Sequence, residues 1–146
     1  MTRLRSAPQS RMQYVWPLDG DVQAVGHART TIRTLLTQLK IAADIVDDAV
    51  LMVSELVTNA FLYGDAPYEM VLNVDHKEIV CVVVDSGEPL PAPRAPDLHS
   101  EGGRGLHIVA ALSNGVHGSH RRHYLTWPEL TGKATWFALP RIAGAT

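Results

Sequence analysis

One long apolar segment, residues 44–64, constrains the fold more than any other part of this 146-residue chain. Its apolar residues recur every three or four positions, which is the period of a helix with one buried face. They are Val46, Val50, Val53, Val57 and Ala60. The pattern predicts a helix that starts at Asp44, stops at the C′ residue Gly64 and packs against a core.

Two polar side chains, Glu55 and Asn59, interrupt this apolar helix. Residues four apart lie on the same face of a helix, so both can point toward one ligand. An unpaired buried polar group costs about 1–3 kcal/mol, so each of these side chains needs a partner. A cation, a water or a nucleotide would supply one, or each side chain could simply cap a neighbouring backbone group.

Composition narrows the class of protein. A chain of 146 residues, 46% hydrophobic and 19% charged, is an ordinary single soluble domain. Its formal net charge of −2 gives no electrostatic basis for direct binding to nucleic acid or to an anionic membrane. No apolar run is long enough to span a bilayer, and the single cysteine, Cys81, fits a reducing compartment. We therefore expect a cytoplasmic protein that binds neither nucleic acid nor a membrane directly.

The other periodic segments place helices and strands in separate runs. Helical spacing predicts a first helix from its cap, Asp21, to about Lys40, and a third helix at residues 106–112. Alternating patterns predict strands at residues 11–16, 68–75, 78–84, 116–126 and 133–139. This order predicts an α+β two-layer sandwich, with the helices on one face of a mixed, mostly antiparallel sheet.

Residues 11–140 are expected to form one domain between two tails. Residues 1–10 are polar and lack apolar periodicity, which predicts a flexible N-terminal tail, and residues 141–146 form a short C-terminal one. Residues 88–100 contain four prolines and few apolar residues. Such a long irregular loop is uncommon in a compact domain, so a functional lid is one interpretation.

Two further polar clusters follow apolar elements. Asp85-Ser86-Gly87 ends a strand, where the carboxylate can accept a hydrogen bond from an exocyclic amine and the glycine lets a flat ring approach. A plain turn is the alternative. Gly102-Gly103-Arg104-Gly105 opens the expected third helix, and its backbone N–H groups could bind phosphate. A glycine hinge for a lid is the alternative there.

Together these clusters resemble the GHKL ATPase superfamily, which includes gyrase, MutL and histidine kinases and shares the Bergerat ATP-binding fold. The matching motifs are Glu55-Leu-Val-Thr-Asn59-Ala, Asp85-Ser-Gly87-Glu-Pro89 and Gly102-Gly-Arg-Gly-Leu106-His-Ile-Val109. The resemblance covers nearly the whole chain. It is closest to the small bacterial anti-sigma-factor serine/threonine kinases, supported by Arg29 and by the ending Gly132-Lys133-Ala-Thr-Trp136-Phe-Ala-Leu-Pro140.

The resemblance implies a role for each motif. Asn59 would hold a Mg²⁺ ion that bridges the ATP phosphates, and Glu55 would be the general base. Asp85 would receive the adenine amino group, with Gly87 giving the ring room. The phosphate-binding turn would comprise Gly103, Arg104, Gly105 and Leu106. Residues 89–101 would be the ATP lid.

The chain departs from the family pattern at three places. Tyr63-Gly64 replaces the usual His-Gly or His-Ala, and Asn114-Gly115 replaces a usual Trp-Gly. Thr135 is expected to contact adenine, but Ala134 precedes it where relatives carry threonine. Alternation along a strand would then point Thr135 to the face opposite Ala134.

The resemblance implies an ATP-binding serine/threonine protein kinase in a partner-switching system. It would bind a sigma factor and phosphorylate an anti-sigma-factor antagonist, and a homodimer is a further expectation. The alternative is a non-catalytic ATP-binding regulatory module whose lid or dimer state controls partner binding. The histidines His120 and His123 lack metal-ligand spacing and are expected to face solvent.

Overall fold

The computed structural model describes residues 11–87 and 116–141 of the chain. Its elements are β1 (Met12–Leu18), α2 (Val22–Gln38), α3 (Ala43–Tyr63), β2 (Tyr68–Val74), β3 (Glu78–Asp85), β4 (His117–His123) and β5 (Thr131–Pro140). The predicted third helix, the lid, the phosphate-binding turn and the N-terminal tail lie outside these residues.

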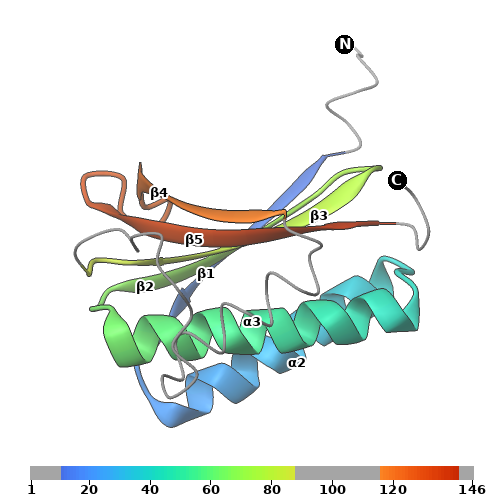
Figure 1. Ribbon diagram of the computed structural model, residues 1–146, viewed down its shortest axis with the longest axis horizontal. Helices are drawn as coiled ribbons and strands as arrows, with labels where there is room; N and C mark the ends of the chain where they lie inside the picture. Colours follow the sequence, from blue (N-terminus) through green and yellow to red (C-terminus); the bar gives the residue numbers. More distant parts are fainter. Residues whose placement is uncertain (1–10, 88–115, 142–146) are drawn as a thin grey trace.

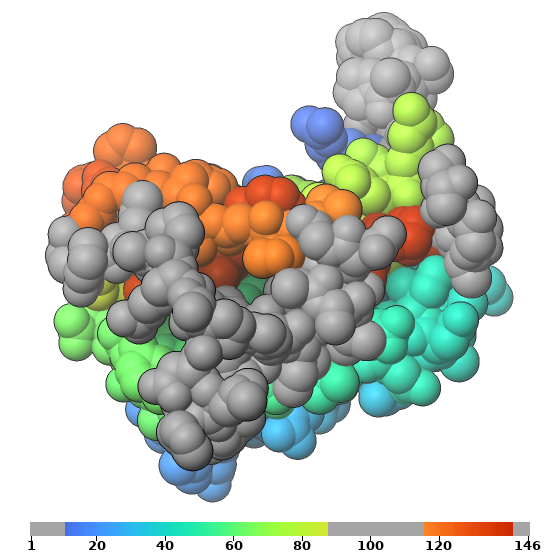
Figure 2. Space-filling model, viewed as in Figure 1, coloured from blue at the N-terminus to red at the C-terminus, as the bar shows by residue number. Residues whose placement is uncertain are grey.

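The strands form one sheet in the order β1-β2-β3-β5-β4, and each pairing between described strands is antiparallel. Both described helices lie on the same face of this sheet (Figure 1). The two layers are also visible in the space-filling view, with the orange atoms of β4 on one side and the green and teal atoms of α3 on the other (Figure 2). The predicted α+β two-layer sandwich is confirmed.

The main core lies between the helices and the sheet. Helix α3 buries the predicted stripe, Val46, Val50, Val53, Val57 and Ala60, against the sheet residues Met70, Leu72, Cys81, Val83 and Phe137. Val22, the first residue of α2, is 90% exposed although it is apolar, and the helix buries Ala24 in that turn instead. Burial raises the pKa of the Cys81 thiol to about 12, so this cysteine is a core side chain and not a nucleophile.

A smaller apolar cluster covers the opposite face of the sheet. Its buried members are Val71, Val82, Val84, Tyr124 and Ala134, and Val80, Trp127 and Trp136 pack against them. Tyr124 and Trp127 come from the turn between β4 and β5. The central strands β2 and β3 are therefore buried on both faces, which explains the nearly continuous apolar sequence of residues 79–84.

Among the predicted strand boundaries that differ from the structure, two have identifiable reasons, and β5 begins at Thr131, two residues before the prediction. Strand β1 continues through Pro17 to Leu18, because β2 is its single partner among the described strands and proline is tolerated on an edge strand. Strand β4 ends at His123 and not at residue 126. The N–H of Tyr124 still donates to the carbonyl of Leu130, but those of Leu125 and Thr126 donate to the carboxylate of Glu69.

The ends of the two helices also differ from the prediction. Helix α2 ends at Gln38, and Lys40 adopts a left-handed φ of 65° so that the N–H of Ile41 reaches the carbonyl of Leu36. Helix α3 begins at Ala43, one residue before Asp44, and has no side-chain cap at its N-terminus. Neither described helix is long and apolar enough to cross a membrane.

Candidate functional site

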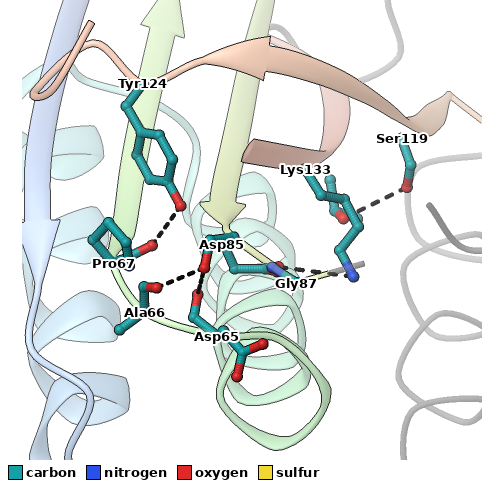
Figure 3. Close-up of polar contacts among 10 residues, drawn as sticks. Asp65, Ala66, Pro67, Asp85, Gly87, Ser119, Tyr124 and Lys133 are labelled. Carbon is teal, nitrogen blue, oxygen red and sulfur yellow. Dashed lines mark hydrogen bonds and ion pairs between the residues drawn. The ribbon is translucent and has the colours of Figure 1, made fainter. Parts of the chain in front are cut away.

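The candidate site centres on Asp85, the last residue of β3. Its carboxylate is only 3% exposed, and its Oδ1 atom accepts a hydrogen bond of 2.7 Å from the N–H of Gly87. The neighbouring Ser86 donates its N–H to the carbonyl of Asp65 at 2.8 Å, and its hydroxyl donates to the carbonyl of Ala66 at 2.6 Å. These bonds tie the end of β3 to the turn that follows α3 (Figure 3).

Glycines surround Asp85 because no side chain would fit beside it. A Cβ atom on Gly64 would overlap the carboxyl carbon of Asp85, and one on Gly87 would lie 2.8 Å from its Oδ1. A Cβ on Gly132 would lie 2.6 Å from the Asp85 carbonyl oxygen. Gly64 was predicted to end α3 as a C′ glycine, yet its φ is −109°, which any residue can adopt. Space beside Asp85, and not backbone conformation, requires glycine here.

The Asp85 carboxylate carries an electrostatic cost. Burial raises the pKa of Asp85 above its usual value, while the Gly87 N–H and the Lys133 ammonium lower it in part. A buried carboxylate with a raised pKa gains from each additional donor that approaches it. Asp85 is therefore well suited to accept a hydrogen bond from a ligand amine.

Glu55 and Asn59 lie on the edge of α3, next to its buried face. Glu55 is half-buried, whereas the Oδ1 atom of Asn59 is fully buried and has no hydrogen-bond partner among the described residues. An unpartnered buried amide oxygen is rare and indicates a missing donor or cation. Amide oxygens are suitable ligands for Mg²⁺, which binds few protein groups and keeps waters. Asn59 therefore fits a magnesium site.

The order of these residues along α3 follows from helix geometry. Gly64, at the end of α3, contacts Asp85. Measured along the axis from Gly64, Asn59 is about 7.5 Å away and Glu55 about 13.5 Å away, at 1.5 Å per residue. Asp85, the Asn59 amide and the Glu55 carboxylate thus follow one another at increasing distance along the length of α3.

Thr135, predicted to contact the base, lies on the helix-facing side of β5. Its register partner Val83 belongs to the main core, whereas Ala134 belongs to the outer cluster. Its hydroxyl lies 3.5 Å from the Ser119 hydroxyl on β4. Thr135 therefore shares a face of the sheet with Asp85, two positions from the residue directly opposite it. The predicted phosphate-binding residues Gly103, Arg104, Gly105 and Leu106 lie outside the described residues.

Lys133 belongs to this site although sequence reasoning gave it no role. It is the register partner of Asp85, and its ammonium Nζ lies 3.9 Å from Asp85 Oδ2. Figure 3 shows its side chain extending from β5 toward Asp85 and Gly87. The alternation Phe137, Thr135, Lys133 along β5 would have placed it on the helix-facing side, but only the register with β3 places it opposite Asp85.

Glu69 and Tyr124 hold the β4–β5 turn behind Asp85. The buried carboxylate of Glu69 accepts the N–H groups of Leu125 and Thr126 at 3.0 and 2.6 Å. The Tyr124 hydroxyl donates to the carbonyl of Pro67 at 2.7 Å (Figure 3). Burial, followed by the nearby charges of Asp85 and Glu69, raises the pKa of Tyr124 to about 12. Tyr124 therefore stays protonated and keeps donating at neutral pH.

Replacing Glu69 by glutamine should weaken the attachment of the β4–β5 turn to β2. The amide retains one acceptor, so one of the two N–H groups faces an NH₂ group and is left unpaired. We expect the free energy of unfolding to fall by about 2 kcal/mol. Urea denaturation measures this change. The exposed Glu129 in the same turn provides a matched control, and Glu129→Gln should leave the midpoint unchanged. Equal midpoints for the Glu69 variant and wild type would show that these two bonds are not stabilising.

One comparison with known protein families agrees with this geometry. The family model described as the histidine kinase-like ATPase domain matches residues 18–126. That match begins at the last residue of β1 and includes α3 and the Asp85 turn. A search of curated proteins finds no match to the chain.

Proposed function

Because the chain belongs to the family of histidine kinase-like ATPase domains, we propose that it binds Mg²⁺-ATP and phosphorylates a protein on serine or threonine. The proposed substrate is an anti-sigma-factor antagonist, and the proposed second partner is a sigma factor. The sequence motifs that resemble anti-sigma-factor kinases support this choice of partners. The family membership supports nucleotide binding and kinase-like chemistry.

The observation that carries the proposal is the buried Oδ1 atom of Asn59, which has no partner among the described residues and lies on the helix whose last glycine, Gly64, meets the Asp85 carboxylate. Asp85 would accept a hydrogen bond from the exocyclic amine of adenine, and the glycines at positions 64 and 87 leave room for the Asp85 carboxylate, not for the ring as the resemblance implied for Gly87. Asn59 would hold Mg²⁺, which neutralises phosphate charge when bound. Asn59 alone among the described side chains would suffice for that contact, because Mg²⁺ commonly takes most of its ligands from phosphate and water.

Glu55 would serve as the general base. Its carboxylate would take the proton of the attacking serine or threonine hydroxyl as that oxygen bonds to the γ-phosphorus. The bond between the γ-phosphorus and the bridging oxygen breaks, and ADP leaves. The half-buried position of Glu55 lets a protein hydroxyl reach it while α3 holds the carboxylate in place.

Calorimetric titration with Mg²⁺-ATP and Mg²⁺-ADP tests the first half of this proposal. We expect both nucleotides to bind, and we expect EDTA to weaken the binding of ATP because Asn59 acts through the metal. Incubation with radiolabelled ATP and candidate antagonists should then yield phosphoserine or phosphothreonine. Failure to bind either nucleotide at millimolar concentration would overturn the function. Binding without transfer to any antagonist would instead favour a regulatory module that uses ATP to control partner binding.

A further inference from the structure

Lys133 places a largely buried positive charge beside the proposed base-binding carboxylate. Its side chain is only 12% exposed, and the β3–β5 register sets it opposite Asp85. Lysine is rarely buried unless it is paired, because its ammonium must lose water. The position of Lys133 therefore calls for acceptors inside the site.

The contact with Asp85 does not satisfy either group. The separation of 3.9 Å between Lys133 Nζ and Asp85 Oδ2 exceeds the length of a hydrogen bond. The other carboxylate oxygen, Oδ1, already accepts from Gly87. No hydrogen bond joins the Lys133 ammonium to an acceptor among the described residues. One acceptor and one charged donor thus lie side by side, each with bonding capacity left for a ligand.

We propose that Lys133 determines base specificity by donating a hydrogen bond to the ring nitrogen N1 of adenine, while Asp85 accepts one from the neighbouring 6-amino group. This inference rests on the proposed function, since it concerns the same nucleotide. Adenine presents an amine donor beside a ring-nitrogen acceptor on one edge. That order complements a carboxylate next to an ammonium.

The same pair discriminates against guanine and hypoxanthine. These bases carry a carbonyl oxygen at position 6 and an N–H at position 1. In the adenine orientation, the carbonyl would face the carboxylate of Asp85 and the N–H would face the ammonium of Lys133. Both contacts would be repulsive in a site with little water. GTP and ITP should therefore bind more weakly than ATP.

The decisive probe is 1-deaza-ATP, in which a C–H replaces the ring nitrogen N1 and the 6-amino group is kept. Calorimetry on the wild-type chain with Mg²⁺ should show about tenfold weaker binding of 1-deaza-ATP than of ATP, the loss expected for one charge-assisted hydrogen bond. The control nucleotide 7-deaza-ATP should bind as ATP does. This comparison needs no substitution, so it does not depend on the folding of a variant.

The variant Lys133→Met provides the second test. It should bind ATP about tenfold more weakly than wild type and bind 1-deaza-ATP as well as it binds ATP, because the donor is missing. The matched control is Lys77→Met, which removes an exposed lysine at the β2–β3 turn and should leave the preference intact. Thermal unfolding confirms that both variants are folded before titration.

Three results would overturn the inference. Equal affinity of the wild type for ATP and 1-deaza-ATP would show that Lys133 does not contact N1. Tighter binding of ATP by Lys133→Met would show that the ammonium competes with the base for Asp85. Equal affinity for GTP and ATP would show that the pair does not discriminate. Each of these presupposes that ATP binds, whereas a chain that binds no nucleotide defeats the proposed function and this inference together.

Discussion

Asp85→Asn should lower the affinity for ATP by at least about 100-fold while the chain stays folded. The asparagine oxygen can still accept from Gly87, but its NH₂ group then faces the exocyclic amine of adenine, so two donors oppose each other. Losing a charge-assisted bond and gaining this repulsion amounts to about 3 kcal/mol, which is the stated loss of affinity. Calorimetric titration of both proteins with Mg²⁺-ATP measures it. Affinity within threefold of wild type would remove Asp85 from the base-binding site.

The same substitution should change how stability depends on pH. The pKa of Asp85 is raised in the folded state, mainly by burial. A raised carboxyl pKa means that the folded chain holds this proton more tightly than the unfolded chain does. Its contribution is therefore favourable below the unfolded pKa and is lost as pH rises through the folded pKa. The stability of Asp85→Asn relative to wild type should thus increase from acid to neutral pH.

Asp75→Asn supplies a control of opposite sign at the far end of β3. The pKa of Asp75 is lowered because its carboxylate accepts the N–H groups of Glu78 and Lys77. Its stabilising contribution is present above the unfolded pKa and is lost as pH falls through the folded pKa. The variant should therefore lose stability relative to wild type at neutral pH, with ATP affinity unchanged. Melting temperatures across the acid range measure both differences.

Glu55→Gln should reduce phosphotransfer at least about 100-fold, the lower end of the effect of a general base. Glutamine has nearly the same shape but cannot take the proton from the attacking hydroxyl. Because Glu55 lies farther along α3 than Asn59, the proposed metal ligand, ATP affinity should change by less than about threefold. Single-turnover transfer of radiolabelled phosphate to the antagonist measures the rate, and calorimetry measures the affinity.

Two further variants of α3 serve as comparisons for the loss of phosphotransfer in Glu55→Gln. Asn59→Ala should lose Mg²⁺-ATP binding itself, because it removes the amide that would hold the metal. Asp47→Asn breaks only the exposed ion pair with Arg33, whose 2.9 Å contact is worth less than about 1 kcal/mol, and should transfer phosphate normally. Wild-type rates in Glu55→Gln would exclude Glu55 as the base. If Glu55→Gln also bound ATP as wild type does, another group would have to accept the proton of the attacking hydroxyl.

The helical and strand periods account for most of the agreement between sequence and structure. The stripe of valines in α3 could be read directly, because a helix with one buried face repeats every 3.6 residues. The same spacing placed Glu55 and Asn59 together. The ends of the elements were less predictable. Strand β4 ends just before two residues whose backbone N–H groups donate to Glu69, which lies on β2, far away in the sequence. Nothing local to residues 117–126 indicates that bond.

The sequence by itself determined the two-layer class, the position of Glu55 and Asn59 on one helix, and Asp85 at the end of a strand. These features depend on local spacing, which a chain expresses before it packs. Only the tertiary structure showed two further features. Residue 64 must be glycine because the Asp85 carboxylate occupies the space beside it, and Lys133 lies opposite Asp85. Both depend on strand register and on how closely α3 approaches β3. Those are long-range properties, set by packing of the entire core and not by neighbours in the chain.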